Sequence, residues 1–350
     1  MRILHVLNSS SFSGAENVAI TIIKQLEKDS NYECYYVSPK GPIEERLREE
    51  NVKYIPIEKL CNKELKRVIK EYKPDVIHAH DFRASLISIL MKNKKTRIIC
   101  HLHNNPPWLR KICINSFIYL IIGQYADRVI AVSESVVSEF VFSKLIKNKV
   151  HVIGNPLEPK RILEKISNIS NVKKIYDVCC IARLTPQKNP ERFIRIISIL
   201  NEKKIKIRAI WIGDGEIKNE VIRICQKYHV QDMIEFIGFK ANPFIYLNES
   251  KVFLLTSDWE GFGLVTYEAI TLGVPCVVSN VGGINQIIND TCGKLCNPNE
   301  IDDYVNEIEK LLTDKEYYDI KVKNSLKQSI KLNNEKEYYR KIKELYEGGW

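Results

Sequence analysis

Short apolar runs alternate with longer segments of helical periodicity along almost the whole chain. In the longer segments apolar side chains recur every three or four residues, as Val18, Ile22 and Leu26 do on one predicted helical face. This alternation is typical of βα units that build a parallel sheet. The apolar runs predict strands over residues 2–7, 33–38, 53–57, 75–79, 97–101, 128–132 and 150–153, then over 177–182, 207–212, 234–237, 251–255 and 275–278. Later helices are predicted near 190–200, 216–228 and 264–272.

The pattern breaks once, near the middle of the 350-residue chain, which is long for a single core. We therefore predict two Rossmann-like, doubly wound domains over residues 1–156 and 173–330, followed by a C-terminal helix over 331–350. Pro156 to about Val172 is predicted to be a linker with a short helix. The charged tail from about Tyr317 is also compatible with a solvated cap on the second domain. Sheets of this type bind ligands at the carboxyl ends of their strands, so two facing domains would form a cleft.

Composition bears mainly on location. Apolar residues make up 45% and charged residues 27%, the balance of an ordinary soluble protein. No run approaches the roughly 18 uncharged apolar residues of a membrane span. The first apolar stretch ends at Leu7, which is short for a secretory signal. We expect a cytoplasmic protein whose ten scattered cysteines are reduced and mostly buried.

The net charge of +10 is concentrated in the first half, where residues 1–155 carry +8. Such an excess suits nucleic acid, an anionic membrane or an acidic substrate, and a solvated lysine-rich surface explains it equally well. The basic residues are dispersed rather than clustered with aromatic residues, so we expect no nucleic-acid partner. Pro106–Lys111 and the apolar Ile112–Ile122 favour either a core helix or a peripheral contact with the inner face of the cell membrane.

The sequence with the most specific chemistry is Asp258–Ala269, which reads DWEGFGLVTYEA and follows a predicted strand. Gly261 and Gly263 lie where a helix is expected to begin, and backbone N–H groups at a helix N-terminus bind phosphate. Glu260 and Glu268 are eight positions apart and suit hydrogen bonds with the hydroxyls of a sugar and of a ribose. A loop carboxylate and a helix N-terminal charge are the structural alternative.

Three further turns follow predicted strands of the second half. Arg183 and Lys188 are two cations that would neutralise a departing diphosphate without a metal; ordinary surface cations are the alternative. Gly213 and Asp214 form a tight turn of low specificity. Gly282–Gly283 would bring backbone amides close to a ligand.

Together these turns resemble the C-terminal domain of the family-4 glycosyltransferases, which are retaining enzymes with the GT-B fold. The family's two glutamates correspond to Glu260 and Glu268, and its diphosphate-binding pair to Arg183 and Lys188. One departure is that no glutamate closes the segment after Gly282–Gly283. The resemblance implies donor binding by Gly14, Gly213, Asp214, Gly261, Phe262, Gly263, Leu264 and Glu268, and catalytic roles for Arg183, Lys188, Glu260 and His103.

The same resemblance implies the substrates. The donor would be a nucleotide-diphosphate sugar, first of all a UDP-sugar, and the acceptor a glycan or a lipid-linked sugar in bacterial surface polysaccharide assembly. It implies no cofactor and no metal, and the chain lacks the Asp-x-Asp motif of the other main glycosyltransferase fold. The alternatives are a GT-B phosphorylase, a sugar-nucleotide epimerase and a non-catalytic nucleotide-sugar-binding partner.

In the first half, the segment Ser11–Glu16 follows the first strand and resembles the family's glycine-containing loop, with Gly14 near donor phosphate and acceptor. It lacks the three glycines of a dinucleotide-binding fingerprint, which argues against NAD. Two His-x-His pairs, at residues 78–80 and 101–103, end two strands. These imidazoles either pack internally or lie at the cleft, and the resemblance favours His103 as the one near the reacting carbon. Metal ligation by these pairs is the less favoured alternative, because the family generally needs no metal.

Overall fold

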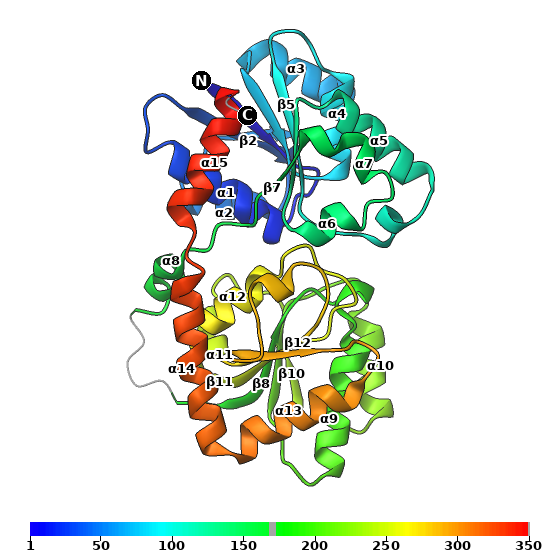
Figure 1. Cartoon of the computed structure of the whole chain (residues 1–350), viewed down its shortest axis with the longest axis vertical. Coiled ribbons are helices and arrows are strands. Elements are labelled where there is room, and N and C mark those ends of the chain that lie inside the picture. Colours follow the sequence, from blue (N-terminus) through cyan, green and yellow to red (C-terminus); the bar gives the residue numbers. More distant parts are fainter. Residues whose placement is uncertain (168–172, 349–350) are drawn as a thin grey trace. The chain divides into compact units, whose positions relative to one another are not determined.

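The computed structural model describes residues 1–167 and 173–348, which form two compact units (Figure 1). The first unit contains Met1–Pro156 and the C-terminal segment from Asn334, and the second contains Leu157–Asn333. The predicted linker falls partly on residues 168–172, which lie outside the described residues.

The first unit is built on a seven-stranded sheet whose strands all pair in parallel, in the order β3-β2-β1-β4-β5-β6-β7. All seven strands predicted from the apolar runs are present. They are β1 Arg2–Val6, β2 Glu33–Pro39, β3 Tyr54–Ile57, β4 Val76–Ala79, β5 Arg97–Leu102, β6 Arg128–Ala131 and β7 Val150–Val152. The helices are α1 Gly14–Leu26, α2 Ile43–Glu49, α3 Asn62–Tyr72, α4 Phe82–Leu90, α5 Ile114–Tyr125, α6 Glu134–Ser138, α7 Ser143–Ile146 and α15 Glu335–Glu347.

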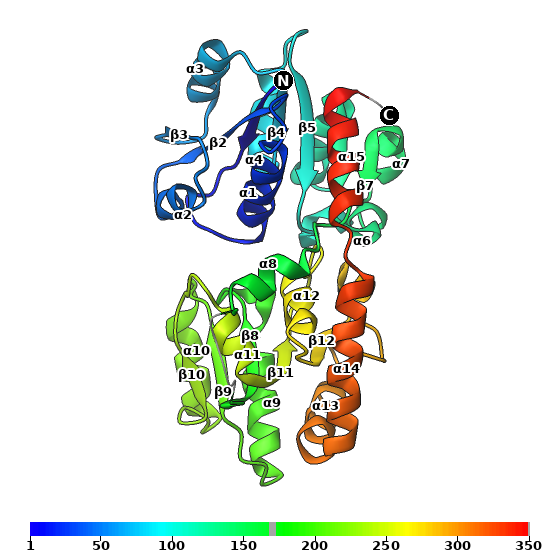
Figure 2. The same ribbon diagram turned by 90° about the vertical axis from the view of Figure 1, so that its left-hand side faces the viewer.

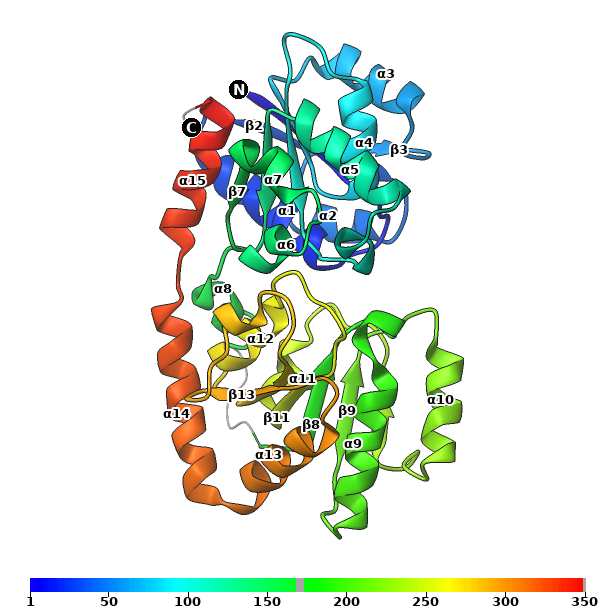
Figure 3. The same ribbon diagram turned by 45° about the vertical axis from the view of Figure 1, so that its right-hand side comes forward.

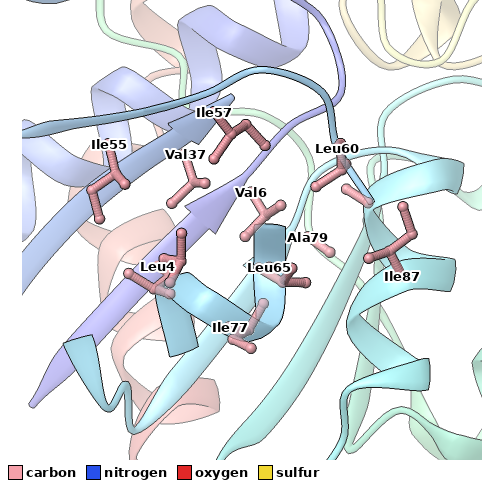
Figure 4. Packing of buried hydrophobic residues seen from close by; sticks show 12 residues of the cluster. Leu4, Val6, Val37, Ile55, Ile57, Leu60, Leu65, Ile77, Ala79 and Ile87 are labelled. Atoms are coloured by element: carbon pink, nitrogen blue, oxygen red, sulfur yellow. The ribbon is translucent and has the colours of Figure 1, made fainter. Parts of the chain in front are cut away.

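The two faces of this sheet carry different side chains. On one face Leu4, Val6 and Ile77 pack against Leu65 of α3 and Ile87 of α4 (Figure 4). Because successive side chains of a strand point to opposite faces, the intervening residues of the same strands point away from this core. The side chains on that other face are unexpectedly polar, because five histidines lie on β1, β4 and β5 or directly after β4 and β5. Sequence periodicity places both sets on strands but does not show what covers each face.

The second unit contains a six-stranded parallel sheet in the order β10-β9-β8-β11-β12-β13. Five strands were predicted, and β13 was not. It is Gly293–Cys296 and pairs with β12 at the sheet edge, Lys294 lying opposite Val277. Four residues that include a glycine and a lysine give no apolar run. The other strands are β8 Tyr176–Ile181, β9 Ala209–Ile212, β10 Ile234–Phe236, β11 Ser250–Leu255 and β12 Cys276–Ser279.

Helices cover both faces of this second sheet (Figures 2 and 3). One layer contains α9, α10 and α13, and α9 contacts each of the other two. The other layer contains α8, α11, α12 and α14. Their bounds are α8 Pro159–Glu164, α9 Pro190–Glu202, α10 Lys218–Lys227, α11 Phe244–Asn248, α12 Leu264–Thr271, α13 Ile301–Thr313 and α14 Lys315–Lys331. The tail therefore divides, because α14 packs on α12 whereas α15 belongs to the first unit and buries residues such as Tyr338 and Tyr346 there.

All ten cysteines are free thiols, and eight of them are buried. Within residues 1–167 and 173–348, no helix combines the length and the apolar composition that crossing a bilayer requires.

Candidate functional site

The two predicted cations follow β8 at the carboxyl edge of the second sheet. Arg183 is exposed, and its guanidinium has no hydrogen-bond or ion-pair partner among the described residues. Lys188 ends a short 3-10 turn, Pro186–Lys188, and its ammonium forms an ion pair with Glu260. One cation at this edge is therefore paired inside the protein, and the other is open to an incoming anion.

Glu260 lies in the loop after β11, the strand next to β8. Its side chain is only 9% exposed in the ion pair with Lys188, and its carboxylate also accepts a hydrogen bond from the Ser257 hydroxyl at 2.7 Å. The Gln187 side-chain amide donates to the Trp259 carbonyl at 2.8 Å and joins the same two loops. The structure thus brings Lys188 and Glu260 together, as their shared sheet edge predicts.

A second set of contacts behind Lys188 was missed in the sequence. Asn189 has a left-handed backbone (φ 46°), and its side-chain oxygen caps α9 by accepting from the Arg192 amide at 3.0 Å. Its side-chain nitrogen donates to both Asp258 oxygens at 3.1 and 3.2 Å. Arg192 pairs with Asp258 at 2.8 Å and donates to the Thr256 carbonyl at 2.7 Å. These bonds hold the loop that carries Lys188 against the loop that carries Glu260.

The turn after β9 packs directly on the backbone beside Arg183. Gly213 has φ 137°, and a Cβ there would lie 2.0 Å from the Ala182 carbonyl oxygen, so only glycine fits. The Leu184 amide donates to the Asp214 carbonyl at 3.0 Å. The Asp214 side chain accepts from the Gly215 amide at 2.9 Å. Gly213 and Asp214 are therefore next to Arg183, and their backbone contacts fix the loop that presents it.

The DWEGFG turn leads into α12 as predicted. Gly263 precedes the helix with φ 81°, and in the described part of the chain the backbone N–H groups of Gly263 and Leu264 have no protein acceptor. Unpaired N–H groups at a helix N-terminus attract anions. The Phe262 side chain is buried, so this residue presents only its backbone, as does Gly261.

Gly282–Gly283 pack against the loop that carries Glu260. A Cβ at Gly282 (φ 59°) would lie 1.6 Å from the Glu260 carbonyl oxygen. The Gly283 amide donates to the Gly261 carbonyl at 3.1 Å. This pair supports the Glu260 loop from below, and the Gly283 amide is engaged there rather than offered to a ligand.

Glu268 lies on α12, and its side chain is partly exposed. Loss of hydration raises the pKa of its carboxyl to about 7, although the positive charges of Lys165 and Arg161 oppose the shift. The carboxylate has no hydrogen bond or ion pair with another of the described residues. A carboxylate without a protein partner is free to accept hydrogen bonds from a ligand.

The first unit contributes Gly14 and His103. Gly14 begins α1, and a Cβ added to it would meet nothing within 4 Å, so internal packing does not require glycine at this position. His103 follows β5 and its Nε2 lies 3.0 Å from Nδ1 of His80. Burial lowers the pKa of His103 to about 3, so its imidazole is neutral at physiological pH.

Both halves of the chain resemble known proteins. A family model described as Glycosyltransferase Family 4 matches residues 12–161, and one described as Glycosyl transferases group 1 matches residues 160–328. The structure superposes on Alr3699/HepE from Anabaena, solved in complex with UDP and glucose, with a TM-score of 0.86 over 99% of this chain and 100% of that one, at 18% identity. The chain is a glycosyltransferase with the GT-B fold.

Two relatives of this glycosyltransferase show how far the similarity extends. The UDP-Gal:alpha-D-GlcNAc-diphosphoundecaprenol alpha-1,3-galactosyltransferase of Escherichia coli is 25% identical over 99% of this chain and 96% of its own length. An uncharacterized glycosyltransferase of Methanocaldococcus jannaschii, MJ1059, is 29% identical over 60% of this chain, and the chain spans 57% of that protein.

Proposed function

We propose that this glycosyltransferase moves a hexose from a UDP-sugar to a glycan or lipid-linked acceptor, with retention of configuration, during bacterial surface polysaccharide assembly. The observation that carries the donor half is the unpaired Arg183 at an edge that also holds Lys188 and the open amides before α12. HepE, which shares the fold, was solved with UDP. The E. coli relative is named for a UDP-Gal donor and a diphosphoundecaprenol acceptor.

In this proposal Arg183 and Lys188 neutralise the diphosphate as it leaves. Arg183 is free to approach it directly. The Lys188 ammonium has three donors and can keep Glu260 on one while it turns another to a phosphate oxygen. The N–H groups of Gly263 and Leu264 would add two neutral donors to the same anion. Gly213 and Asp214 contribute by holding the Arg183 loop.

The two glutamates would contact the neutral parts of the donor. Glu260 is held by Lys188 and Ser257 and would accept hydrogen bonds from the transferred sugar. Glu268 would hold the ribose hydroxyls with a carboxylate that has no hydrogen bond or ion pair among the described residues. The acceptor would approach Gly14 and the neutral His103. In the net transfer the bond from the anomeric carbon to the diphosphate oxygen breaks, a bond to the acceptor hydroxyl oxygen forms, and the hydroxyl proton passes to the departing diphosphate.

A panel of nucleotide sugars tests the donor assignment. Only ligands that bind the folded state raise its melting temperature, so UDP-sugars should do so and NAD should not. NMR of the product from the active donor should give the anomeric configuration of the donor itself. Transfer of the sugar to orthophosphate would favour the phosphorylase instead. Epimerisation of the donor sugar without an acceptor would favour the epimerase. Binding without turnover on any acceptor would favour the non-catalytic partner.

We also propose that the first unit contacts an anionic membrane through α5. Helix α5 has no charged residue and leaves an apolar stripe open to solvent, because its buried residues are on the other side. Ile114 is 78% exposed and Tyr125 62%, with Phe117 and Ile121 between them. Leu145 on the neighbouring α7 is 62% exposed. An exposed apolar stripe of this kind is typical of interfacial helices.

The segment of the chain that contains this stripe is basic. From Lys92 to Lys149 the chain has ten Lys or Arg residues against three Asp or Glu. Lys111, Lys144 and Lys147 are exposed near α5 and α7. Basic residues near an anionic lipid surface contribute about 1 kcal/mol each.

Vesicle sedimentation tests the membrane contact. The protein should bind vesicles containing phosphatidylglycerol more strongly than vesicles of phosphatidylcholine alone. Replacing Phe117 and Ile121 with serine should abolish the difference. Ile330→Ser, which removes a 73% exposed apolar side chain from the second unit, is the matched control and should bind as the wild type does. Equal binding by all forms would reject this surface.

A further inference from the structure

Five of the seven histidines of the chain form one layer inside the first unit. They come from β1, from β4 and β5, and from the residues just after β4 and β5. In the sheet His5 lies opposite His78, and because every second residue of a strand shares a face, the others fall on the same side. Neighbouring rings are 3.8–5.5 Å apart between centroids. The members are His5, His78, His80, His101 and His103.

Hydrogen bonds divide this histidine layer into two chains. In the first, Nδ1 of His5 lies 2.9 Å from Nε2 of His80, whose Nδ1 lies 3.0 Å from Nε2 of His103. In the second, the Tyr346 hydroxyl of α15 lies 2.6 Å from Nδ1 of His78. Nε2 of His78 in turn lies 3.1 Å from Nδ1 of His101.

Each chain ends on a buried nitrogen. Nε2 of His5, Nε2 of His101 and Nδ1 of His103 have no hydrogen-bond partner among the described residues. An unsatisfied buried polar group costs about 1–3 kcal/mol, and such groups in a native protein point to a bound ion or water. The Nε2 atom of His101 is of particular interest, because His101 is 1% exposed and neighbours the close pair formed by His80 and His103.

We propose that His80, His101 and His103 form a binding site for a divalent transition-metal ion of the zinc type. One nitrogen of each ring lies within 4.8 Å of the others. Tetrahedral zinc with Zn–N bonds of about 2.0–2.1 Å needs ligand nitrogens about 3.3 Å apart. Nδ1 of His80 and Nε2 of His103 are already 3.0 Å apart, and His101 has its Nε2 unused.

The remaining histidines are placed to support these ligands. A metal takes the lone pair of one ring nitrogen, so the proton stays on the other and must be donated outward. For His80 that donor is Nε2, which faces Nδ1 of His5. For His101 it is Nδ1, which faces Nε2 of His78. His78 then donates through its own Nδ1 to Tyr346. A bound metal would therefore fix the direction in which the protons are donated along each chain of hydrogen bonds. Without a metal, each chain can run in either of two directions.

Charge and access both favour this set of three. Desolvation holds the pKa of all three imidazoles well below the usual value, so each keeps a free lone pair at neutral pH. His103 is partly exposed, whereas His80 and His101 are buried, so of the three ligands His103 is the one in contact with solvent. A second set, His5 with His78 and His80, is fully buried, and both nitrogens of His78 are hydrogen-bonded.

The site shares His103 with the proposed acceptor side, but its test measures metal alone and therefore stands apart from the test of the transfer reaction. Untagged full-length protein, treated with chelator and dialysed, is titrated with Co²⁺. We expect one tightly bound ion per chain with the visible absorption of tetrahedral cobalt, and displacement by Zn²⁺. Zn²⁺ should also raise the melting temperature of the protein. Wild-type protein that binds no Co²⁺ at micromolar concentrations would overturn the site without reference to any variant.

Variants then locate the ion. His103→Ala and His101→Ala each remove a ligand and should weaken Co²⁺ binding more than about 100-fold, while Tyr346→Phe removes only an outer partner and should weaken it about 10-fold to 100-fold. His151→Ala and His229→Ala change the two histidines outside the layer and should bind like the wild type. Undiminished binding in His103→Ala and Tyr346→Phe, with their circular dichroism unchanged, would assign the ion elsewhere.

Discussion

The two sheets have the same parallel, doubly wound construction, yet they hold their polar side chains in different places. In the second unit the polar groups lie beyond the strand ends, in loops, where Arg183 is open and Lys188 is paired with Glu260. In the first unit they lie on the sheet face itself, as buried imidazoles of lowered pKa such as His80 and His101. In both units the fold places these polar groups near an edge of the sheet. Whether a group is charged there is decided by how deeply it is buried. The second edge therefore presents a charged group, Arg183, and the first presents neutral imidazoles.

The edges also differ in how tightly their loops are held. In the second unit another segment of backbone packs directly against Gly213 and Gly282. A Cβ at these positions would lie 2.0 and 1.6 Å from carbonyl oxygens, so a larger residue does not fit. In the first unit a Cβ added at Gly14 would meet nothing within 4 Å. Internal packing therefore explains why Gly213 and Gly282 are glycines, and it does not explain Gly14.

The largest effect should come from the open cation of the second edge. Arg183→Ala removes a charge that has no protein partner among the described residues, so folding should be unaffected. Loss of one group that stabilises a developing anion typically lowers kcat by about 10²–10³-fold. Steady-state kinetics with the donor found in the panel would measure the change. Arg195→Ala on the exposed side of α9 is the matched control and should retain full activity.

The next effect concerns stability, in addition to the loss of turnover expected when Lys188 is removed. Lys188→Met leaves the Glu260 carboxylate, 9% exposed, with the Ser257 hydroxyl and no cation. Isolating one charge of a largely buried pair costs about 3 kcal/mol, which urea unfolding would detect. The double variant Lys188→Met/Glu260→Gln removes both charges and should recover much of that loss. If the single variant were as stable as the wild type, the ion pair would not hold this edge together.

A smaller effect, about tenfold, should follow from Glu268. With a pKa of about 7, its carboxyl is mostly protonated at pH 6 and mostly ionised at pH 8. If the ionised form holds the ribose, the affinity for a UDP-sugar should rise about tenfold over this range. Isothermal titration would measure it, and Glu268→Gln should flatten the profile. A wild-type profile as flat as that of the variant would remove Glu268 from the donor site.

For the protein without donor, the raised pKa of Glu268 has the opposite effect, because it lowers the stability of the folded state as pH rises. The unfolded chain ionises this carboxyl near 4.5 and the folded protein near 7, so the folded state is penalised as pH rises between these values. Stability contributed by Glu268 is full below about 4.5 and is lost by about 7. Glu268→Gln should reduce this loss, which gives a control that requires no ligand.

Sequence patterns predicted the strands and turns that are determined by residues close together in the chain. The apolar runs gave twelve strands of the two sheets, and the DWEGFG motif indicated the turn into α12. The edge strand β13 was missed because half of a short edge strand can be polar. The bonds among Asn189, Arg192 and Asp258 were missed because nearly 70 residues separate their two sides.

The histidine layer shows where such reasoning ends. Both His-x-His pairs were singled out in the sequence, but His5 was not. Its contact with His80 exists only because the strand order places β1 beside β4. Strand order is a property of the whole sheet, and the local periodicity that identifies a strand carries no information about it. The hydrogen bond between Tyr346 and His78 is still harder to predict from the sequence, because α15 lies at the far end of the chain.

The smallest change in stability, and the sharpest contrast between the edges, is expected at Gly14. In Gly14→Ala the added methyl group meets open space at the start of α1. Replacing glycine at an unstrained helical position should leave stability unchanged or raise it by about 0.5–1 kcal/mol. Gly282→Ala, in contrast, forces a clash at a positive φ and should destabilise the second unit. If a substrate approaches Gly14 closely, the stable Gly14→Ala protein should still show a raised KM. Unchanged KM for both donor and acceptor would leave this loop without a role in binding.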